Sequence, residues 1–223
     1  MKLKKLLEKL LAALWRRDWL GGMANHTPDT QAQTGAGAKP PARLRRFFAY
    51  KWFYVCAASV LVPDQVSKAW VARILPFDSY GHGAHIEVIP GFFNIVHVGN
   101  TGAAWSILSG HGGLLAVFAV VVLIAIFFAR KAIGLRDGGA QIALGLMCGG
   151  IVGNLVDRLM HNHVIDFLDF APPLYGRIVH ALFGWPADSH YPAFNIADAG
   201  ICAGAAIYFA ITLFSGREKK AGS

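Results

Sequence analysis

Residues Gly149–Phe170, GGIVGNLVDRLMHNHVIDFLDF, begin as an apolar helix and end as a polar loop. The last apolar run of the chain begins with a second acidic island, Phe194–Asp198 (FNIAD). Ionisable side chains at the ends of membrane-length segments are costly to place there, so they are candidates for function. We therefore expect Asp166 and Asp198 to meet at one face of a membrane. The changeover in the first stretch carries four polar residues: Asn154, Asp157, Arg158 and Asp166.

The composition indicates a membrane protein. Of the 223 residues, 55% are hydrophobic and only 15% are charged, which is too apolar for an ordinary soluble domain. The net charge is +8, but the basic residues cluster in Met1–Arg46, Arg130–Arg136 and Arg217–Lys220, next to apolar runs. Nucleic-acid binding would require a basic face with aromatic residues between the charges, so we do not expect it.

Four apolar runs predict an all-α polytopic membrane protein with spans at about 47–75, 112–129, 140–156 and 194–215. The first run is interrupted by Pro63–Lys68. We expect its helix to continue, because aromatic and aliphatic residues resume at Trp70, and Asp64 and Lys68 would then share one face. The alternative is that this helix leaves the membrane at Pro63.

Small residues repeat at helical spacing in the last two runs. Gly145, Gly149 and Gly153 are four residues apart, and so are Gly200 and Gly204. This spacing is typical of helices that pack closely against neighbours in a membrane.

Two segments between the runs are expected to lie outside the membrane. His85–Ile89 and Phe92–Val98 are rich in β-formers around the turn signal Pro90-Gly91, which predicts a small hairpin or cradle. Asp157–Ala193 is interpreted as a long polar loop with an apolar patch at Ile178–Trp185.

The distribution of Lys and Arg predicts the orientation and the domains. The basic N-terminal extension and linker (1–46), the Arg130–Arg136 loop and the basic tail (217–223) should all be cytoplasmic. The membrane domain then comprises residues 47–216, with both termini in the cytoplasm. Its acidic residues gather near the opposite, extracytoplasmic face.

Paired aspartates are the chemistry that this island supports best. The sequence contains no HExxH zinc motif, and His161 and His163 form only a loose pair. No serine-centred glycine-rich motif is present. Two carboxylates that share one proton can activate water without a metal or cofactor. The local sequence ranks Asp166 only weakly ahead of Asp169. The reason is that the neighbours of Asp166 are apolar, and burial among them would raise its pKa.

Five blocks of this sequence, in order, resemble the lipoprotein signal peptidase family (signal peptidase II), the prolipoprotein-processing aspartyl peptidases of bacterial membranes. The resemblance covers about residues 47–215, and the ordered set is specific where any one block is weak. The blocks are Asp64–Lys68, Asn100–Ser106, Gly149–Arg158, Val164–Phe167 and Phe194–Asp198.

The resemblance implies four membrane helices, an extracytoplasmic β-cradle, and a multi-pass protein of the bacterial inner membrane with no cofactor and no metal. It places the catalytic pair at Asp166 and Asp198. The implied substrates are prolipoproteins, cleaved before the diacylglyceryl cysteine, and the expected partners are their signal peptides and membrane lipids, with the chain acting as a monomer. The predicted substrate-binding or supporting residues are Asp64, Lys68, Asn100, Gly102, Asn154, Asp157, Arg158, Asn195 and Ala197.

Two features depart from the family pattern. The N-terminal extension is longer than the family core requires. The segment between Asp166 and Asp198 looks long for the family, and the extra loop, Ala171–Tyr191, is a candidate lid or docking element.

Rival classes fit the pattern less well. A transporter would place its polar residues near the bilayer midplane in repeated halves, and no internal repeat is visible. A phosphatidyltransferase would require several aspartates on one metal-binding face. A structural membrane subunit explains the spans but not the four acidic residues at one face.

The predicted orientation can be tested with reporter fusions. Reporters placed after Lys131 and at the C-terminus should report cytoplasm, because the basic segments stay inside. Reporters near Gly81 and Gly176 should report the outside. An external signal from the Arg130–Arg136 loop would contradict this orientation, since it would place the acidic residues on both sides.

Overall fold

The computed structural model describes residues 48–80, 83–102, 110–186 and 189–221. All of them belong to one compact unit, Arg43–Ser223. The N-terminal extension expected at residues 1–46 and the Ala103–Ser106 part of the second sequence block lie outside the described residues.

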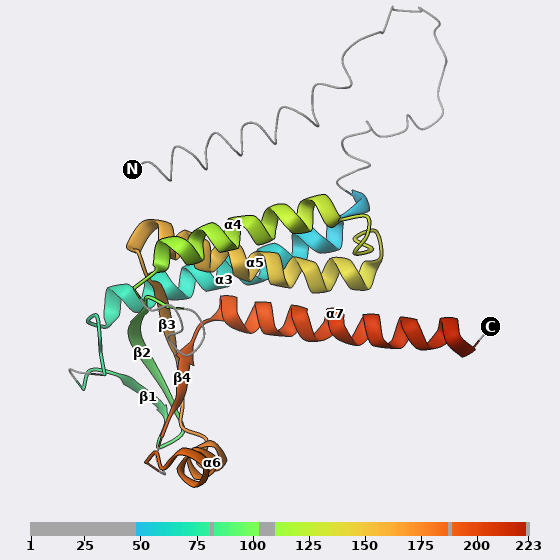
Figure 1. Cartoon of the computed structure of the whole chain (residues 1–223). Helices are drawn as coiled ribbons and strands as arrows, with labels where there is room; N and C mark the ends of the chain where they lie inside the picture. Colours follow the sequence, from blue (N-terminus) through green and yellow to red (C-terminus); the bar gives the residue numbers. More distant parts are fainter. Residues whose placement is uncertain (1–47, 81–82, 103–109, 187–188, 222–223) are drawn as a thin grey trace, which may run out of the picture. The chain divides into compact units, whose positions relative to one another are not determined.

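Four long helices lie side by side (Figure 1). They are α3 (Lys51–Ile74), α4 (Gly112–Ala129), α5 (Gly138–His161) and α7 (Ile196–Ala221). The central helix α5 is largely buried, whereas α4 buries only Ala116 among its residues.

Three stretches in the described part of the chain are long and apolar enough to cross a membrane: Gly112–Ala129, Gly138–His161 and Ile196–Phe214. Helix α3 does not qualify, because Asp64, Gln65 and Lys68 lower its mean hydropathy. The sequence predicted four spans, and the structure supports three of them by length and composition.

Helix α3 continues through Pro63, as predicted from the sequence. Pro63 itself is exposed. Asp64, the next residue, and Lys68, one turn after Asp64, are buried on the same face of the helix. The hydroxyl of Ser67 donates to the carbonyl oxygen of Pro63 at 2.8 Å. The polar interruption therefore lies inside a continuous helix and faces the protein interior.

The predicted close packing at the small residues is confirmed. A Cβ atom added at Gly145 would lie 2.6 Å from the carbonyl oxygen of Phe53 in α3. One added at Gly149 would overlap the carbonyl oxygen of Ala57, and one at Gly204 would overlap that of Ala143. Backbone therefore contacts backbone between α3 and α5 and between α5 and α7.

A four-stranded antiparallel sheet with strand order β1-β2-β3-β4 adjoins one end of the helices (Figure 1). The predicted hairpin is present, with Gly91 at φ 66° in its turn. Its strands pair Ile86 with Ile95 and Glu87 with Asn94. The strands are β1 (Ile86–Ile89), β2 (Phe93–Asn100), β3 (Val164–Phe170) and β4 (Tyr191–Phe194).

The interpretation of Asp157–Ala193 as a polar loop was wrong. Helix α5 extends to His161, and the segment then forms β3, a further helix α6 (Pro173–Phe183), and β4. The acidic residues in Val164–Phe170 suggested a loop, but the sheet buries both Asp166 and Asp169. Their burial depends on pairing with β2, which is distant in sequence.

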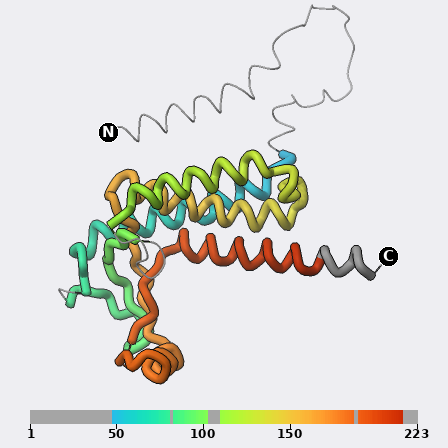
Figure 2. Tube along the Cα trace, viewed as in Figure 1, coloured from blue at the N-terminus to red at the C-terminus, as the bar shows by residue number. Residues whose placement is uncertain are grey.

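The sheet is joined to the helices both through packing and through the chain. Val71 of α3 and Leu75, just after this helix, form a buried cluster with Phe167 of β3, and Ile196 of α7 packs against it. The trace in Figure 2 shows β4 leading directly into α7. This junction brings the start of α7 next to β3.

Substituting one glycine at a helix contact should destabilise the protein. Gly150→Ala would drive a methyl group into the backbone carbonyl of Ala197, so we expect a loss of roughly 1–3 kcal/mol. The matched control is Gly113→Ala in α4, where an added Cβ contacts nothing within 4 Å. The control should be neutral or slightly stabilising, by at most about 1 kcal/mol. Thermal unfolding of both purified variants in detergent checks the difference, and equal melting temperatures would contradict it.

Candidate active site

Two carboxylates, one buried and one half-buried, lie where β3 meets the start of α7. Asp166 projects from β3 and is 2% exposed, and Asp198 lies in the first turn of α7. Both bind Asn195: its Nδ2 donates to Oδ1 of Asp166 at 2.7 Å, and its backbone N–H donates to Oδ2 of Asp198 at 3.3 Å. One asparagine therefore contacts both carboxylates.

Asn195 and Asp198 cap the start of α7 reciprocally. The side-chain oxygen of Asn195 accepts the backbone N–H of Asp198 at 2.9 Å, while the Asp198 carboxylate accepts the backbone N–H of Asn195. This is a capping box, which satisfies N–H groups that have no partner within the helix. The positive end of the helix dipole also favours a negative charge at Asp198.

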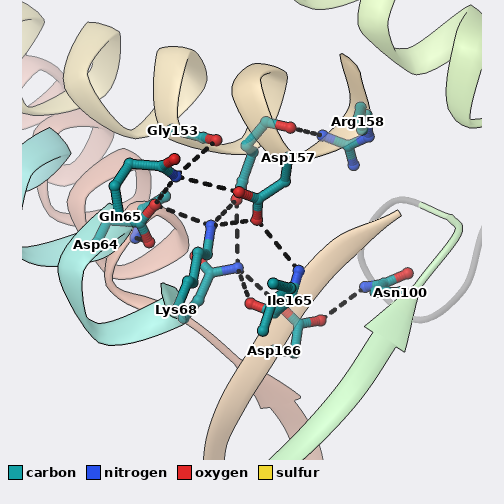
Figure 3. A network of polar contacts seen from close by, with 12 residues as sticks. Asp64, Gln65, Lys68, Asn100, Gly153, Asp157, Arg158, Ile165 and Asp166 are labelled. Carbon is teal, nitrogen blue, oxygen red and sulfur yellow. Dashed lines mark hydrogen bonds and ion pairs between the residues drawn. The ribbon is translucent and has the colours of Figure 1, made fainter. Parts of the chain in front are cut away.

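Behind this pair, Lys68 of α3 joins two further carboxylates (Figure 3). Its Nζ lies 2.9 Å from Oδ2 of Asp64 and 2.8 Å from Oδ2 of Asp157 in α5. All three side chains are at most 3% exposed, so the ion pairs are screened little by solvent. The sequence placed Asp64 and Lys68 on one face, and this geometry confirms it.

The Lys68 ammonium also orients the amide of Asn154. It donates to Oδ1 of Asn154 at 3.0 Å, and an ammonium can only donate. The amide nitrogen of Asn154 must therefore point the other way, where it donates to Oδ1 of Asp198 at 2.7 Å. The buried Lys68 ammonium thus determines that Asn154 presents its amide nitrogen, and not its oxygen, to Asp198.

The carboxylates of Asp64 and Asp157 also accept hydrogen bonds from backbone N–H groups. Ala197 N–H donates to Oδ1 of Asp64 at 2.9 Å, and Ile165 N–H donates to Oδ2 of Asp157 at 3.1 Å. Ala197 is fully buried beside Gly153, whose added Cβ would lie 3.3 Å from the Ala197 methyl group. A larger residue at position 197 would not fit there.

Asn100 and Arg158 link the end of β2 to the site. Asn100 Nδ2 donates to Oδ2 of Asp166 at 3.0 Å, and Asn100 Oδ1 accepts the backbone N–H of Gly102 at 2.9 Å. Arg158 donates to the carbonyl oxygen of Gly102 at 3.0 Å. The segment at Gly102 is therefore fixed from both sides, next to the catalytic candidate Asp166.

The environment of Asp166 favours its protonated form. Burial, and next the nearby charge of Asp198, raise the pKa of Asp166 from 3.8 to about 7, although the hydrogen bonds from Asn100 and Asn195 oppose the shift. One carboxyl group of the pair can therefore hold a proton near neutral pH. Paired carboxylates of this kind can act as acid and base.

Asp169 belongs to a separate cluster. It is fully buried, accepts a hydrogen bond from Asn94 Nδ2 at 2.9 Å, and lies 2.8 Å from His190 Nδ1. Tyr80 bonds to it as well, and its own burial, with this contact second, raises the pKa of Tyr80. Successive residues of a strand face opposite sides, and Asp169 is three residues after Asp166 in β3, so it points away from Asp166.

Sequence reasoning missed Gln65 as a site residue. Its Nε2 donates to Oδ2 of Asp64 and to Oδ1 of Asp157, both at 3.1 Å, and so links α3 to α5. The available signal was the expense of a glutamine next to Asp64 inside a membrane-length run. His161 and His163 lie with ring centroids 6.0 Å apart, and no group of three histidine, cysteine or acidic residues that could hold a metal occurs among the described residues.

Membrane-length helices that end at two aspartates held by one asparagine indicate an aspartic peptidase of the membrane as the class of protein. The family model of signal peptidase (SPase) II matches residues 56–214, and the chain belongs to this family of aspartic peptidases.

Similar proteins align with most of the chain. The lipoprotein signal peptidase of Shewanella baltica (strain OS155 / ATCC BAA-1091) is 39% identical over 175 residues, which cover 76% of this chain and 89% of that protein. The lipoprotein signal peptidase of Bacillus pumilus (strain SAFR-032) is 35% identical, covering 76% and 97%. A bacterial membrane enzyme solved by the in meso method at 2.3 Å resolution is 31% identical, with a TM-score of 0.60 and coverage of 75% and 90%.

The raised pKa of Asp166 predicts how stability depends on pH. The folded chain keeps a proton on Asp166 that the unfolded chain releases above its pKa of 3.8. The stabilisation is therefore complete below that pH and is lost as the pH rises through about 7. Its upper bound is about 4 kcal/mol, at about 1.36 kcal/mol per pKa unit.

Thermal unfolding of the wild type and Asp166→Asn across this pH range measures the effect. The melting temperature of the wild type should fall relative to that of the variant as the pH rises, because asparagine does not titrate. Titrations of groups away from the Asp166–Asp198 pair cancel in the comparison. A difference that stays constant with pH would show that Asp166 titrates at an ordinary value.

Proposed function

We propose that the chain removes the signal peptide from lipid-modified bacterial prolipoproteins and cleaves before the diacylglyceryl cysteine. Asp166 and Asp198 are the catalytic residues of this proposal. The observation that carries it is the shared contact of both carboxylates with Asn195. The substrate class is supported by the relatives, which are lipoprotein signal peptidases.

The proposed reaction is hydrolysis by a water molecule held between the two carboxyl groups. The ionised carboxylate takes a proton from the water, and the resulting oxygen attacks the scissile carbonyl carbon. The protonated carboxyl group donates to the carbonyl oxygen, so that a tetrahedral intermediate forms. When this intermediate collapses, the C–N bond breaks and a proton passes to the leaving nitrogen.

The surroundings of the two aspartates support a division of roles before substrate binds. Asp166 is buried in the sheet, and its pKa is raised to about 7, so it is assigned the proton. Asp198 lies at the start of α7 and accepts from Asn154 and from backbone N–H of Asn195, so it is assigned the charge. The two groups titrate as a coupled pair, and the measured pKa values belong to the pair.

The remaining predicted residues have supporting roles. Lys68, Asp64 and Asp157 fix Asn154 and the start of α7, and Arg158 and Asn100 fix the segment at Gly102. None of these contacts requires a metal or cofactor.

The proposed membrane arrangement adds α3 as a fourth span. Its polar residues Asp64 and Lys68 are paired and buried inside the protein, so they do not face lipid. The proposed domains are residues 1–46, 47–216 and 217–223, with both termini cytoplasmic and the site at the extracytoplasmic face of the inner membrane. The chain is proposed to act as a monomer.

Substitution of either aspartate should abolish cleavage. Asp166→Asn and Asp198→Asn each remove a carboxyl group from the pair, and the double variant should be no worse than either one, because the pair acts as a unit. A lipidated prolipoprotein peptide, incubated with purified protein, measures cleavage. Activity should persist in the presence of a strong chelator and follow a bell-shaped pH dependence.

Two control variants separate the pair from other carboxylates. Asp137→Asn keeps a good capping residue at the far end of α5 and should leave cleavage unchanged. Asp169→Asn should retain cleavage at reduced abundance, since it alters a buried cluster away from the pair. Cleavage by Asp166→Asn together with an inactive Asp169→Asn would overturn the assignment.

A further inference from the structure

Helix α6, Pro173–Phe183, carries an apolar stripe that no described residue covers. Leu174, Ile178 and Leu182 follow one another at intervals of four residues, so they lie on one face, and they are 68%, 46% and 69% exposed. Trp185, just after the helix, is also exposed. The helix makes up much of Ala171–Tyr191, the extra segment whose role the sequence left open.

The stripe is not the face that packs against the sheet. Gly176 and Val179, on another side of α6, are buried. Tyr175 packs its ring against Tyr191 of β4, with centroids 5.4 Å apart. The helix is therefore already attached to the protein, and the stripe is a second apolar face.

The position of α6 along the chain keeps it close to a membrane span. Tyr191, which contacts α6, is five residues before Ile196, where α7 begins as a candidate span. Five extended residues reach at most about 17 Å. Figure 1 shows the strands running across the direction of the helices, with α6 at the far end of the sheet and at about the same level along the helices as the start of α7.

The exposed residues of α6 match the surface that lipid covers elsewhere on the protein. Helices α4 and α7 expose large apolar side chains such as Phe118 and Phe209, as expected for helices that face lipid. The stripe on α6 exposes side chains of the same apolar kind, at about the level along the helices where α7 begins (Figure 1). Aromatic residues such as Trp185 are typical of the boundary between lipid and water.

The charge of α6 also fits a lipid surface. The helix contains Arg177, which is exposed next to Ile178, and no acidic residue. A cationic side chain at the border of an apolar stripe can reach phosphate groups while its neighbours insert among the acyl chains.

We propose that α6 lies in the lipid–water interface at the level where α7 begins, with Leu174, Ile178 and Leu182 inserted into the bilayer and Arg177 at the phosphate level of anionic phospholipids. The helix then anchors the far end of the β3–β4 pair to the membrane that α7 crosses. Because β3 carries Asp166, this second anchor holds the sheet at a constant height above the bilayer. The inference rests on the membrane span at α7 and is independent of the proposed cleavage.

Spin labels can measure the depth of α6 directly. Single cysteines at Ile178 and Leu182 test the stripe, and one at His180, exposed on a different side, is the matched control. The native cysteines, Cys56, Cys148 and Cys202, are replaced by alanine, and the labelled proteins are placed in nanodiscs of phosphatidylethanolamine and phosphatidylglycerol. Collision rates with oxygen, which concentrates in lipid, and with a water-soluble nickel chelate are then compared.

The labels at Ile178 and Leu182 should collide more with oxygen, and the label at His180 more with nickel. Arg177→Glu should move the stripe labels toward water in discs that contain phosphatidylglycerol, and less so when phosphatidylcholine replaces it. Stripe labels that are accessible to nickel would overturn the proposal. Labels shielded from both reagents would also overturn it, because they would indicate a protein occupant such as a second copy of the chain.

A second measurement uses tryptophan fluorescence in the protein with its native cysteines. Brominated lipids quench tryptophans at the bilayer surface, and Trp185→Phe removes one exposed tryptophan while keeping an aromatic side chain. The quenchable share of the fluorescence should fall in this variant. An unchanged share would place Trp185 in water and overturn the proposal, whatever the outcome of cleavage assays.

Discussion

The ammonium group of Lys68 lies buried between the carboxylates of Asp64 and Asp157, and it joins α3 to α5 at the level of the site. Removing three charged groups from water is expensive, and the expense is offset only when each is paired with good geometry. Here the carboxylates are satisfied by further donors, including the backbone N–H of Ala197 and that of Ile165. The ion pairs therefore also tie the start of α7 and the start of β3 to the helices.

The polarity of the whole site follows from this cation. Lys68 can only donate, so Asn154 turns its oxygen toward Lys68 and its amide nitrogen toward Asp198. In the same way, the backbone N–H of Asp198 requires the oxygen of Asn195, which leaves its nitrogen for Asp166. Each aspartate thus meets a donor whose orientation is determined elsewhere, and the pair is held before any substrate arrives.

Close helix packing makes these short contacts possible. Gly153 leaves space for the carboxylate of Asp64, since an added Cβ would lie 2.6 Å from its Oδ2. Gly149 and Gly150 bring the backbone of α5 against α3 and α7. Small residues and charged residues are therefore parts of one arrangement, because a wider helix spacing would separate the ion pairs. The sheet adds the last carboxylate from outside this helical packing.

Local sequence patterns were sufficient for the four long helices but not for α6. They were also sufficient for the hairpin at Gly91, the shared face of Asp64 and Lys68, and the small-residue contacts at Gly149. These features depend on residues that are close in sequence or on the size of one residue. Tertiary structure alone decided that Val164–Phe170 is a strand, because its partner, β2, is distant along the chain and Val98 pairs with Asp166. That pairing turns Asp166 toward Asn195 and Asp169 toward His190, a distinction that spacing ranked only weakly. The amide orientations and the role of Gln65 were likewise decided by donors and acceptors on different helices, which no local period encodes.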